Sequence, residues 1–239
     1  MEQIRIVLVS PSHPGNIGSA ARAMKTMGLT KLCLVAPRDF PHANAEALAS
    51  GASDVLRNAK LFNSLDDALT GTVFSIAATA RRRELSHTVL TPAEVAETIK
   101  AKISKGDDIA IVFGPERTGL TIEDAMRCNV LSMIPSNPEY ASLNLAQAVQ
   151  VFAYEIWSRR EVEGSVNEGS EQILMARHEE VERLIEHFER VSVDIGFLNI
   201  NNPGRLMQRI RRLLKRTELE REELNILRGF LSAIEKKGL

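Results

Sequence analysis

Three consecutive runs of sequence set the architecture of the chain: IRIVLV at residues 4–9, GSAARAMKTM at residues 18–27 and KLCLVA at residues 31–36. The outer two runs are rich in aliphatic residues, as in buried strands. The middle run consists of helix formers and is followed by Gly28, a residue type that commonly ends a helix. This pattern predicts a strand, a helix and a second strand that pairs in parallel with the first.

The same alternation continues to about residue 160. Further β-rich runs predict strands at 59–62, 73–78, 109–113 and 130–134. Helical patterns lie at 45–50, 65–69, 92–103 and 142–160. Six strands that alternate with helices indicate an α/β fold, in which a parallel sheet is covered by helices on both faces.

The composition changes after Arg160. Residues 161–172 (EVEGSVNEGSEQ) are polar and contain glycine, which is typical of a linker. Beyond them, helical periodicity at 173–193, 205–216 and 220–236 predicts a small all-helical extension. We therefore expect an α/β domain at residues 1–160 and a helical C-terminal extension at residues 173–239.

Charge and cysteine usage exclude several classes of protein. The chain has 30 Lys and Arg against 31 Asp and Glu, so its net charge of −1 gives no general argument for nucleic acid binding. Cys33 and Cys128 stand far apart without partners at metal-ligand spacing, which argues against a disulfide framework or a zinc site. No secretory leader or membrane-span pattern is present, and we expect a cytoplasmic protein with reduced thiols.

Candidate site residues follow four of the predicted strands. Asn16 and Arg22 come after the first strand, residues 79–81 after the fourth, residues 114–119 after the fifth and residues 135–144 after the sixth. Open parallel sheets bind ligands at the carboxyl ends of their strands, so these loops are expected to converge on one site. Each residue alone also has a structural alternative, such as starting the following helix.

Three common kinds of ligand site fit this sequence poorly. PGNIGS at residues 14–19 lacks the GxG spacing of a dinucleotide loop, although Asp39 stands near the place of a ribose-binding acid. The segment GPERTGLT has Leu120 where a phosphate loop has lysine, which argues against an NTPase. The five histidines have no spacing that would organise a nucleophile or a metal.

Three segments, in order, resemble the motifs of the SpoU branch of the SPOUT RNA 2′-O-methyltransferases. They are PGNIGSAARA at residues 14–23, IVFGPERTGL at residues 111–120 and IPSNPEYASLNLAQAV at residues 134–149. The resemblance covers roughly the first 160 residues. NPEYASLNL, GASDVL at residues 51–56 and ELNILRG at residues 223–229 are similar to the bacterial members that methylate nucleotide 32 in the tRNA anticodon loop.

The resemblance implies S-adenosylmethionine as the methyl donor, a trefoil knot in the C-terminal part of the first domain and a homodimer with active sites at its interface. It places Arg22 and Ser142 beside the transferring methyl, with Asn16, Glu116 and Asn144 in support. It implies that the donor is bound by Thr79, Ala80, Arg81, Gly114, Ile134, Ala141, Ser142, Leu143 and Asn144. No metal is implied.

The chemistry suits these residue types. A ribose 2′-hydroxyl is a weak acid and a poor nucleophile, so methyl transfer requires an in-line approach and help with the hydroxyl proton. A positive Arg22 near the hydroxyl would stabilise developing alkoxide character and bind the adjacent phosphate. Because guanidinium is effectively never deprotonated in proteins, we prefer charge stabilisation to a general-base role for Arg22.

RNA binding also needs a local basic surface. Arg82 and Arg83 extend the fourth-strand loop, and the helical pattern at 205–216 contains no acidic residue. Its cations are Arg205, Arg209, Arg211, Arg212, Lys215 and Arg216. Helical spacing predicts that the core face consists of Leu206, Ile210, Leu213 and Leu214. The cations are then expected to face solvent or RNA phosphate, and an ordinary solvated face is the alternative.

The sequence therefore predicts a homodimeric, S-adenosylmethionine-dependent tRNA 2′-O-methyltransferase that acts on cytidine or uridine at nucleotide 32. One alternative is a non-catalytic RNA-binding protein that retains the fold. Another is a 2′-O-methyltransferase that acts at a different RNA position. A nicotinamide-dependent dehydrogenase is the third alternative, on the strength of the first glycine loop alone.

Overall fold

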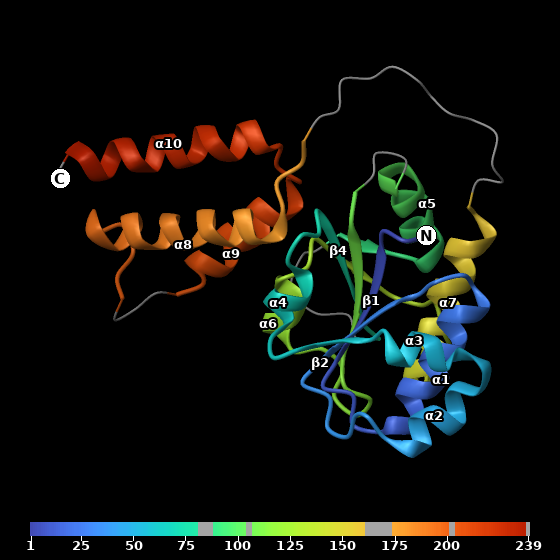
Figure 1. Ribbon diagram of the computed structural model, residues 1–239. Helices are drawn as coiled ribbons and strands as arrows, with labels where there is room; N and C mark the ends of the chain where they lie inside the picture. The colour runs from blue at the N-terminus through green and yellow to red at the C-terminus, as the bar shows by residue number, and fades with distance from the viewer. Residues whose placement is uncertain (81–87, 104–106, 161–173, 201–203, 238–239) are drawn as a thin grey trace.

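The computed structural model describes residues 1–80, 88–103, 107–160, 174–200 and 204–237. Within these ranges the chain forms a seven-stranded sheet of order β3-β2-β1-β6-β4-β7-β5 (Figure 1). Every strand pair in it is parallel, which confirms the predicted α/β class. The strands are β1 (Ile4–Val9), β2 (Lys31–Val35), β3 (Lys60–Phe62), β4 (Phe74–Ala78), β5 (Val89–Leu90), β6 (Ile109–Phe113) and β7 (Val130–Ser132).

Strand side chains alternate between two apolar layers. Ile4, Ile6 and Leu8 of β1 belong to the core on one face of the sheet, whereas Val7 and Val9 belong to the core on the other. Helices on the first face are α1 (Pro14–Thr26), α2 (Ala43–Ala49), α3 (Ser53–Arg57), α5 (Pro92–Ile103) and α7 (Leu145–Ser158). Helices on the second face are α4 (Leu65–Leu69) and α6 (Ile122–Met126).

Element ends differ from the predicted ones where side chains cap helices. Helix α1 begins at Pro14 and not at residue 18, because His13 Nδ1 accepts a hydrogen bond from the backbone nitrogen of Gly15 at 3.1 Å. Helix α7 begins at Leu145, because Asn144 is its N-cap. The prediction missed the two-residue strand β5 and the short helices α3 and α6, whose patterns are too brief to show a period.

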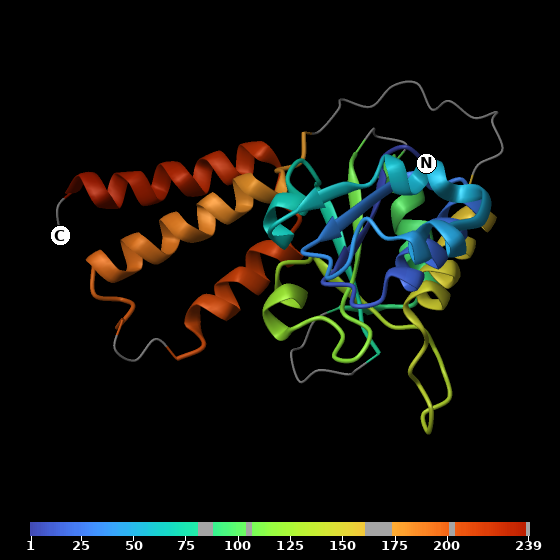
Figure 2. The ribbon, with the colours of Figure 1, turned by 60° about the horizontal axis from the view of Figure 1, so that its bottom comes forward.

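The C-terminal part of the chain contains the helices α8 (His178–Asp194), α9 (Leu206–Arg216) and α10 (Arg221–Lys237). They share a separate apolar core, to which α8 contributes Leu184 and Ile185 and α10 contributes Leu224 and Leu231. In Figure 2 they form an arm that projects from the side of the sheet that carries α4 and α6. The expected linker, residues 161–172, lies entirely outside the described residues.

Hydrogen bonds to backbone carbonyls hold this arm against the sheet domain. The backbone nitrogen of His178 donates to the carbonyl of Thr72 at 2.8 Å. Asn129 Nδ2 donates to the carbonyl of Lys215 at 2.9 Å.

No helix in the described part of the chain is both long and apolar enough to cross a membrane.

Candidate active site

A pocket of about 330 Å³ lies at the carboxyl ends of β4, β6 and β7, beside the start of α7. It is lined by most of the predicted donor-binding residues, namely Thr79, Ala80, Gly114, Ile134, Ala141, Ser142 and Leu143. Of the other two, Asn144 caps α7 next to the pocket, and Arg81 lies outside the described residues. Parallel strands bring these loops to one edge of the sheet, as the sequence predicted.

One apolar wall of the pocket was missed by the sequence analysis. Phe113 and Phe152 both line it and pack edge to face, with ring centroids 5.4 Å apart. Ala78 and Ser132 also line it. Ala78, Phe113 and Ser132 are the last residues of β4, β6 and β7, so the end of each strand was the signal that could have identified them.

Gly114 is required by the loop that follows β6. A Cβ atom at this position would lie 2.1 Å from the backbone nitrogen of Leu120, far inside any real contact. Gly119 has a φ of 66°, in the left-handed region that favours glycine. The two glycines let the loop fold back on itself beside the pocket.

Three side chains, one from each motif segment, form a hydrogen-bonded chain beside this pocket. Asn144 Nδ2 donates to Asn16 Oδ1 at 3.0 Å, and Asn16 Nδ2 donates to Glu116 Oε1 at 2.9 Å. The chain joins the first turn of α1, the loop after β6 and the N-terminus of α7. The predicted meeting of these three residues is confirmed, and their catalytic roles stay a prediction.

Glu116 accepts hydrogen bonds from two further residues. The backbone nitrogen and Oγ of Ser12 donate to its Oε2 at 2.9 Å and 2.7 Å. The backbone nitrogen of His13 donates to its Oε1 at 3.2 Å. Burial would raise the pKa of Glu116, but hydrogen bonds from Asn16 and Ser12 outweigh it and lower the pKa to about 2. Glu116 is therefore a carboxylate at neutral pH.

The two residues predicted to lie beside the transferring methyl are placed differently. Ser142 is exposed and lines the pocket. Arg22 is exposed on α1, six residues after Asn16, and is not among the residues that line the pocket of its own chain. A single chain thus brings Ser142 to the pocket but does not bring Arg22 there.

The cationic side chains on and next to helix α9 differ in their exposure to solvent. The cations that remain exposed or half-exposed without a described ion-pair partner are Arg205, Arg209, Arg212 and Arg216. Lys215, in contrast, is only 3% exposed, whereas Leu213, which was predicted to face the core, is 46% exposed. The predicted orientation is therefore wrong for these two residues. The predicted RNA contacts Arg82 and Arg83 lie outside the described residues.

The reason for the burial of Lys215 is its pairing with α8. Lys215 Nζ lies 3.1 Å from Glu182 Oε1 and 3.0 Å from His178 Nδ1. Arg211, one turn earlier, also forms an ion pair with Glu182.

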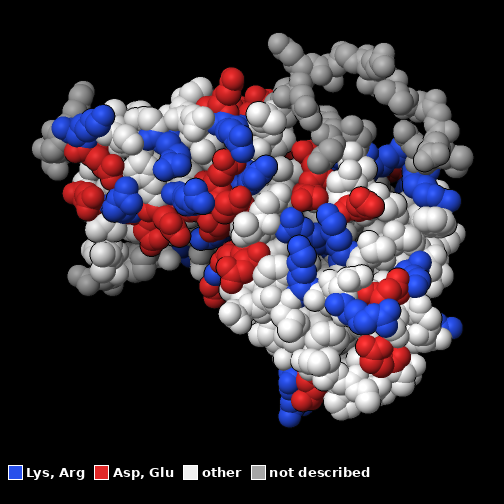
Figure 3. All heavy atoms as spheres, viewed as in Figure 1, with Lys and Arg blue, Asp and Glu red and all other residues white. Residues whose placement is uncertain are grey.

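Figure 3 shows acidic and basic side chains mixed over the visible face of the helical arm, so neither positive nor negative charge dominates this face.

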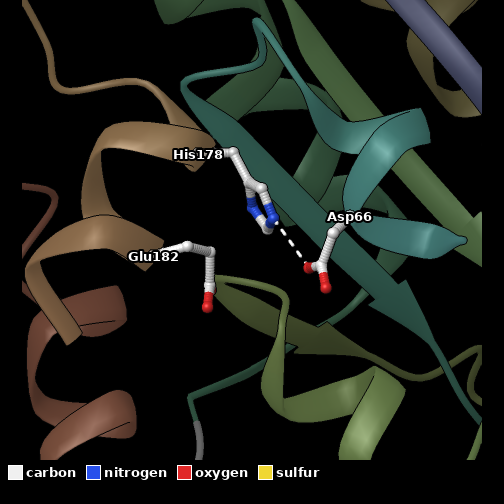
Figure 4. A group of neighbouring side chains, drawn as sticks. All are labelled: Asp66, His178 and Glu182. Carbon is white, nitrogen blue, oxygen red and sulfur yellow. Dashed lines mark hydrogen bonds and ion pairs between the residues drawn. The ribbon is translucent and has the colours of Figure 1, made fainter. Parts of the chain in front are cut away.

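Asp66, His178 and Glu182 gather where the arm meets α4 (Figure 4), with potential ligand atoms within 4.8 Å of one another. Their atoms already have partners. Asp66 accepts hydrogen bonds from Arg127 at 2.9 Å and from His178 Nε2 at 3.0 Å, while Lys215 lies at Nδ1 of the same ring. Burial lowers the pKa of His178, which favours the neutral ring. The arrangement is an ion-pair cluster in which Lys215 and Arg127 supply the cations.

Fold and pocket together define an α/β protein with a ligand site at the carboxyl edge of its sheet, and comparison with known proteins narrows this class. Residues 3–154 match the SpoU rRNA Methylase family. Residues 179–238 match the C-terminal domain of the tRNA methyltransferase TrmJ. The chain therefore belongs to the SpoU methylase family.

Similar proteins match the chain over nearly its whole length. The tRNA (cytidine/uridine-2′-O-)-methyltransferase TrmJ of Photorhabdus laumondii is 46% identical, over 99% of this chain and 98% of its own length. The tRNA (cytidine/uridine/adenosine-2′-O-)-methyltransferase TrmJ of Pseudomonas aeruginosa is 44% identical, over 99% and 95%. The crystal structure of TrmJ from Z. mobilis superposes with a TM-score of 0.84 at 36% identity, covering 97% of this chain and 98% of that one.

Proposed function

We propose that this protein transfers a methyl group from S-adenosylmethionine to the ribose 2′-hydroxyl of nucleotide 32 in the tRNA anticodon loop, at cytidine or uridine. The observation that carries the proposal is the hydrogen-bonded chain Asn144–Asn16–Glu116 at a pocket lined by the predicted donor residues. The names of the similar proteins support tRNA as substrate and the 2′-oxygen as acceptor. Nucleotide 32 rests on the resemblance of segments 51–56, 137–145 and 223–229.

The pocket suits S-adenosylmethionine. Apolar side chains such as Phe113, Ile134 and Leu143 line it next to the backbone of the glycine loop. A Cβ at Gly114 would collide with the backbone of Gly119 and Leu120, so this glycine fixes the shape of the loop that forms one wall of the pocket. When bound, the donor supplies an electrophilic methyl group on a sulfonium sulfur. The residues of the pocket hold it, orient it and exclude water.

Ser142 and Arg22 act on the acceptor. Ser142, exposed at the pocket, binds and orients the 2′-hydroxyl. Arg22 stabilises the negative charge that develops on the ribose oxygen and binds the neighbouring phosphate. A homodimer with active sites at its interface accounts for the position of Arg22, because one protomer then supplies this arginine to the pocket of the other.

Three further parts complete the proposal. The homodimer and the trefoil knot in the C-terminal part of the sheet domain are implied by the resemblance. The domain division at residues 160 and 173 rests on the change in composition after Arg160. The exposed arginines of α9 are proposed to contact tRNA phosphates.

The test is methyl transfer from labelled S-adenosylmethionine to an unmodified tRNA transcript, followed by nuclease digestion and mass spectrometry. We expect a 2′-O-methylated nucleotide 32. We expect Arg22→Ala to lower turnover at least about a hundredfold, as for loss of a charge-stabilising group, and Arg22→Lys to restore it only in part. Arg57→Ala, at an exposed arginine on α3, is the matched control and keeps full turnover.

Each other outcome has a definite meaning. Methylation at a different nucleotide retains the reaction and rejects position 32. An Arg22→Lys variant with normal turnover rejects the need for the planar guanidinium. Absence of transfer to any tRNA by a protein that binds the donor contradicts the proposed function and favours the RNA-binding alternative.

A further inference from the structure

The segment between β1 and α1 holds Glu116 more closely than the motif residues alone would. Ser12 offers Glu116 both its backbone nitrogen and its hydroxyl, at 2.9 Å and 2.7 Å. Ser12 lies outside the set of site residues that the sequence analysis identified. Its backbone is fixed on the N-terminal side, because the nitrogen of Ser10 donates to the carbonyl of Val35 at 2.7 Å and that of Arg38 donates to the carbonyl of Pro11 at 3.2 Å.

The carboxylate of Glu116 is saturated by this segment. A carboxylate has about four lone-pair sites, and Glu116 accepts two hydrogen bonds on each oxygen: two from Ser12 on Oε2, and one each from His13 and Asn16 on Oε1. No site is left to accept the proton of a ribose hydroxyl. A pKa of about 2 agrees with this, because a general base works best with a pKa near the working pH.

Glu116 also supplies a charge that α1 lacks. The first turn of α1 contains no acidic residue. Its N-terminal end presents the backbone N–H groups that a carboxylate or phosphate commonly binds. Glu116, which comes from the loop after β6, provides the anion there and so ties α1 to the pocket wall.

We propose that Ser12 and Glu116 form a positioning pair for methyl transfer, in which Ser12 orients the Glu116 carboxylate. Glu116 in turn fixes the amide of Asn16, and Asn16 fixes Asn144 at the pocket. The pair sets the placement of α1 relative to the glycine loop of its own chain, and hence the position from which Arg22 reaches the pocket of the other protomer. This inference rests on the proposed function, and it assigns Glu116 to positioning and not to proton transfer.

The kinetic test uses the full-length enzyme with tRNA and S-adenosylmethionine. Ser12→Ala removes one charge-assisted hydrogen bond, so we expect kcat to fall about tenfold, while KM for S-adenosylmethionine stays within about twofold. Ser12→Thr keeps the hydroxyl and restores kcat. Ser19→Ala, at a serine of the neighbouring helix α1, is the control and leaves kcat unchanged.

A double-mutant cycle tests whether the two residues act together. Glu116→Gln places an amide donor against the donors of Ser12, His13 and Asn16. We expect it to lower kcat at least as much as Ser12→Ala does, and the double variant to be no slower than Glu116→Gln alone. Between about pH 6 and 9 the profile of kcat should keep its shape in Glu116→Gln. If the reductions in kcat of Ser12→Ala and Glu116→Gln multiply in the double variant, the two residues act independently and the proposal is overturned. If the decrease of kcat at acidic pH disappears in Glu116→Gln, Glu116 acts as a general base and the proposal is also overturned.

Hydrogen exchange gives a readout that does not depend on activity. In Glu116→Gln we expect faster exchange of the Ser12 and His13 amides, with unchanged exchange in the β4 core. If the wild-type enzyme methylates no tRNA but this coupling is present, the proposed function fails and the contact stands. If the enzyme is active but Ser12→Ala retains wild-type kcat, the positioning role of Ser12 is refuted and the proposed function stands.

Discussion

Two polar clusters of this molecule join segments that are distant in sequence, but one relies on hydrogen bonds from neutral groups and the other on ion pairs. The site network consists of Ser12, Asn16, Glu116 and Asn144, half-buried or exposed, and it places one carboxylate among neutral donors. The junction cluster balances the carboxylates of Asp66 and Glu182 against Arg127 and Lys215 around the neutral ring of His178. Lys215 and His178 are buried there.

The difference predicts different consequences of mutation. Water can replace a hydrogen bond that is lost at a half-exposed amide or hydroxyl, so such a loss costs little stability. A buried ion that loses its partner has no such replacement. We therefore expect changes at the site to reduce binding and turnover with little effect on folding, and changes at the junction to reduce stability first.

The largest effect is expected where the site meets the pocket. Gly114→Ala would place a Cβ 2.1 Å from the nitrogen of Leu120, so the glycine loop must move out of its place in the pocket wall. We expect binding of S-adenosylmethionine, measured by calorimetry, to weaken at least about a hundredfold, since close contacts at such a loop leave no room for a side chain. Gly51→Ala, where a Cβ meets nothing within 4 Å, is the matched control. If Gly114→Ala binds S-adenosylmethionine normally, the glycine loop is not part of the donor site.

Lys215→Met is expected to have the next largest effect, and on stability instead of binding. It removes the buried cation beside the mostly buried Glu182, which keeps Arg211 as its remaining ion-pair partner. We therefore expect a loss of stability at or below the lower end of the about 3–5 kcal/mol that breaking a buried ion pair costs. Urea unfolding of the variant should show this loss in the free energy of unfolding. Arg216→Met changes an exposed neighbour on the same helix and should stay within about 0.5 kcal/mol of wild type. A stable Lys215→Met variant would show that the junction does not depend on this ion pair.

The two clusters also differ in how far the sequence predicted them. Asn16, Glu116 and Asn144 each follow a strand or start a helix, and parallel topology brings such positions to one edge whatever the details of packing. Lys215 has no such constraint. Its periodicity placed it with the arginines, but its burial depends on Glu182 and His178, which lie more than thirty residues away. An amphipathic pattern finds one face of a helix, whereas α9 contacts both α6 and α8.

The same distinction applies to the fold. Strand interiors such as β1 and β6 were predicted because buried parallel strands are continuously apolar. The starts of α1 and α7 were missed by several residues because single side chains decide them, whereas α4 and α5 begin at the predicted residues. His13 caps α1 through Nδ1, and histidine is not among the residue types that signal an N-cap in a sequence.

Mild acid should weaken the junction cluster before the site network. Burial lowers the pKa of His178 in the folded state, so below the ordinary value of 6.5 the unfolded state binds the additional proton and the free energy of unfolding falls. Asp66 and Glu182 face the same ring, as does Lys215. The pKa of Asp66 is lowered by its hydrogen bond from His178, so the stability it contributes is lost only at lower pH, below its ordinary value of 3.8.

Urea unfolding at about pH 7.5 and about pH 5.5 measures this effect. The loss of stability between the two pH values should be larger in wild type than in His178→Gln, which cannot titrate there. Glu116, with a pKa of about 2 against an ordinary 4.5, should contribute nothing to the difference in this window. An equal loss in both proteins would assign the pH dependence to groups outside the junction.

The smallest expected effect separates the exposed cations of α9 from the paired ones. Arg209 is exposed and free of described ion pairs, whereas Arg211, on the same helix α9, is paired with Glu182 of α8. If α9 contacts tRNA phosphates, Arg209→Ala should weaken tRNA binding about three- to tenfold and reduce the slope of log K against log salt by about one. Arg211→Ala should change the slope less and the free energy of unfolding more. Fluorescence anisotropy at two salt concentrations measures both slopes. Equal slopes in the two variants would mean that the ion pair with Glu182 opens when tRNA binds, so that the junction and the RNA surface share a residue.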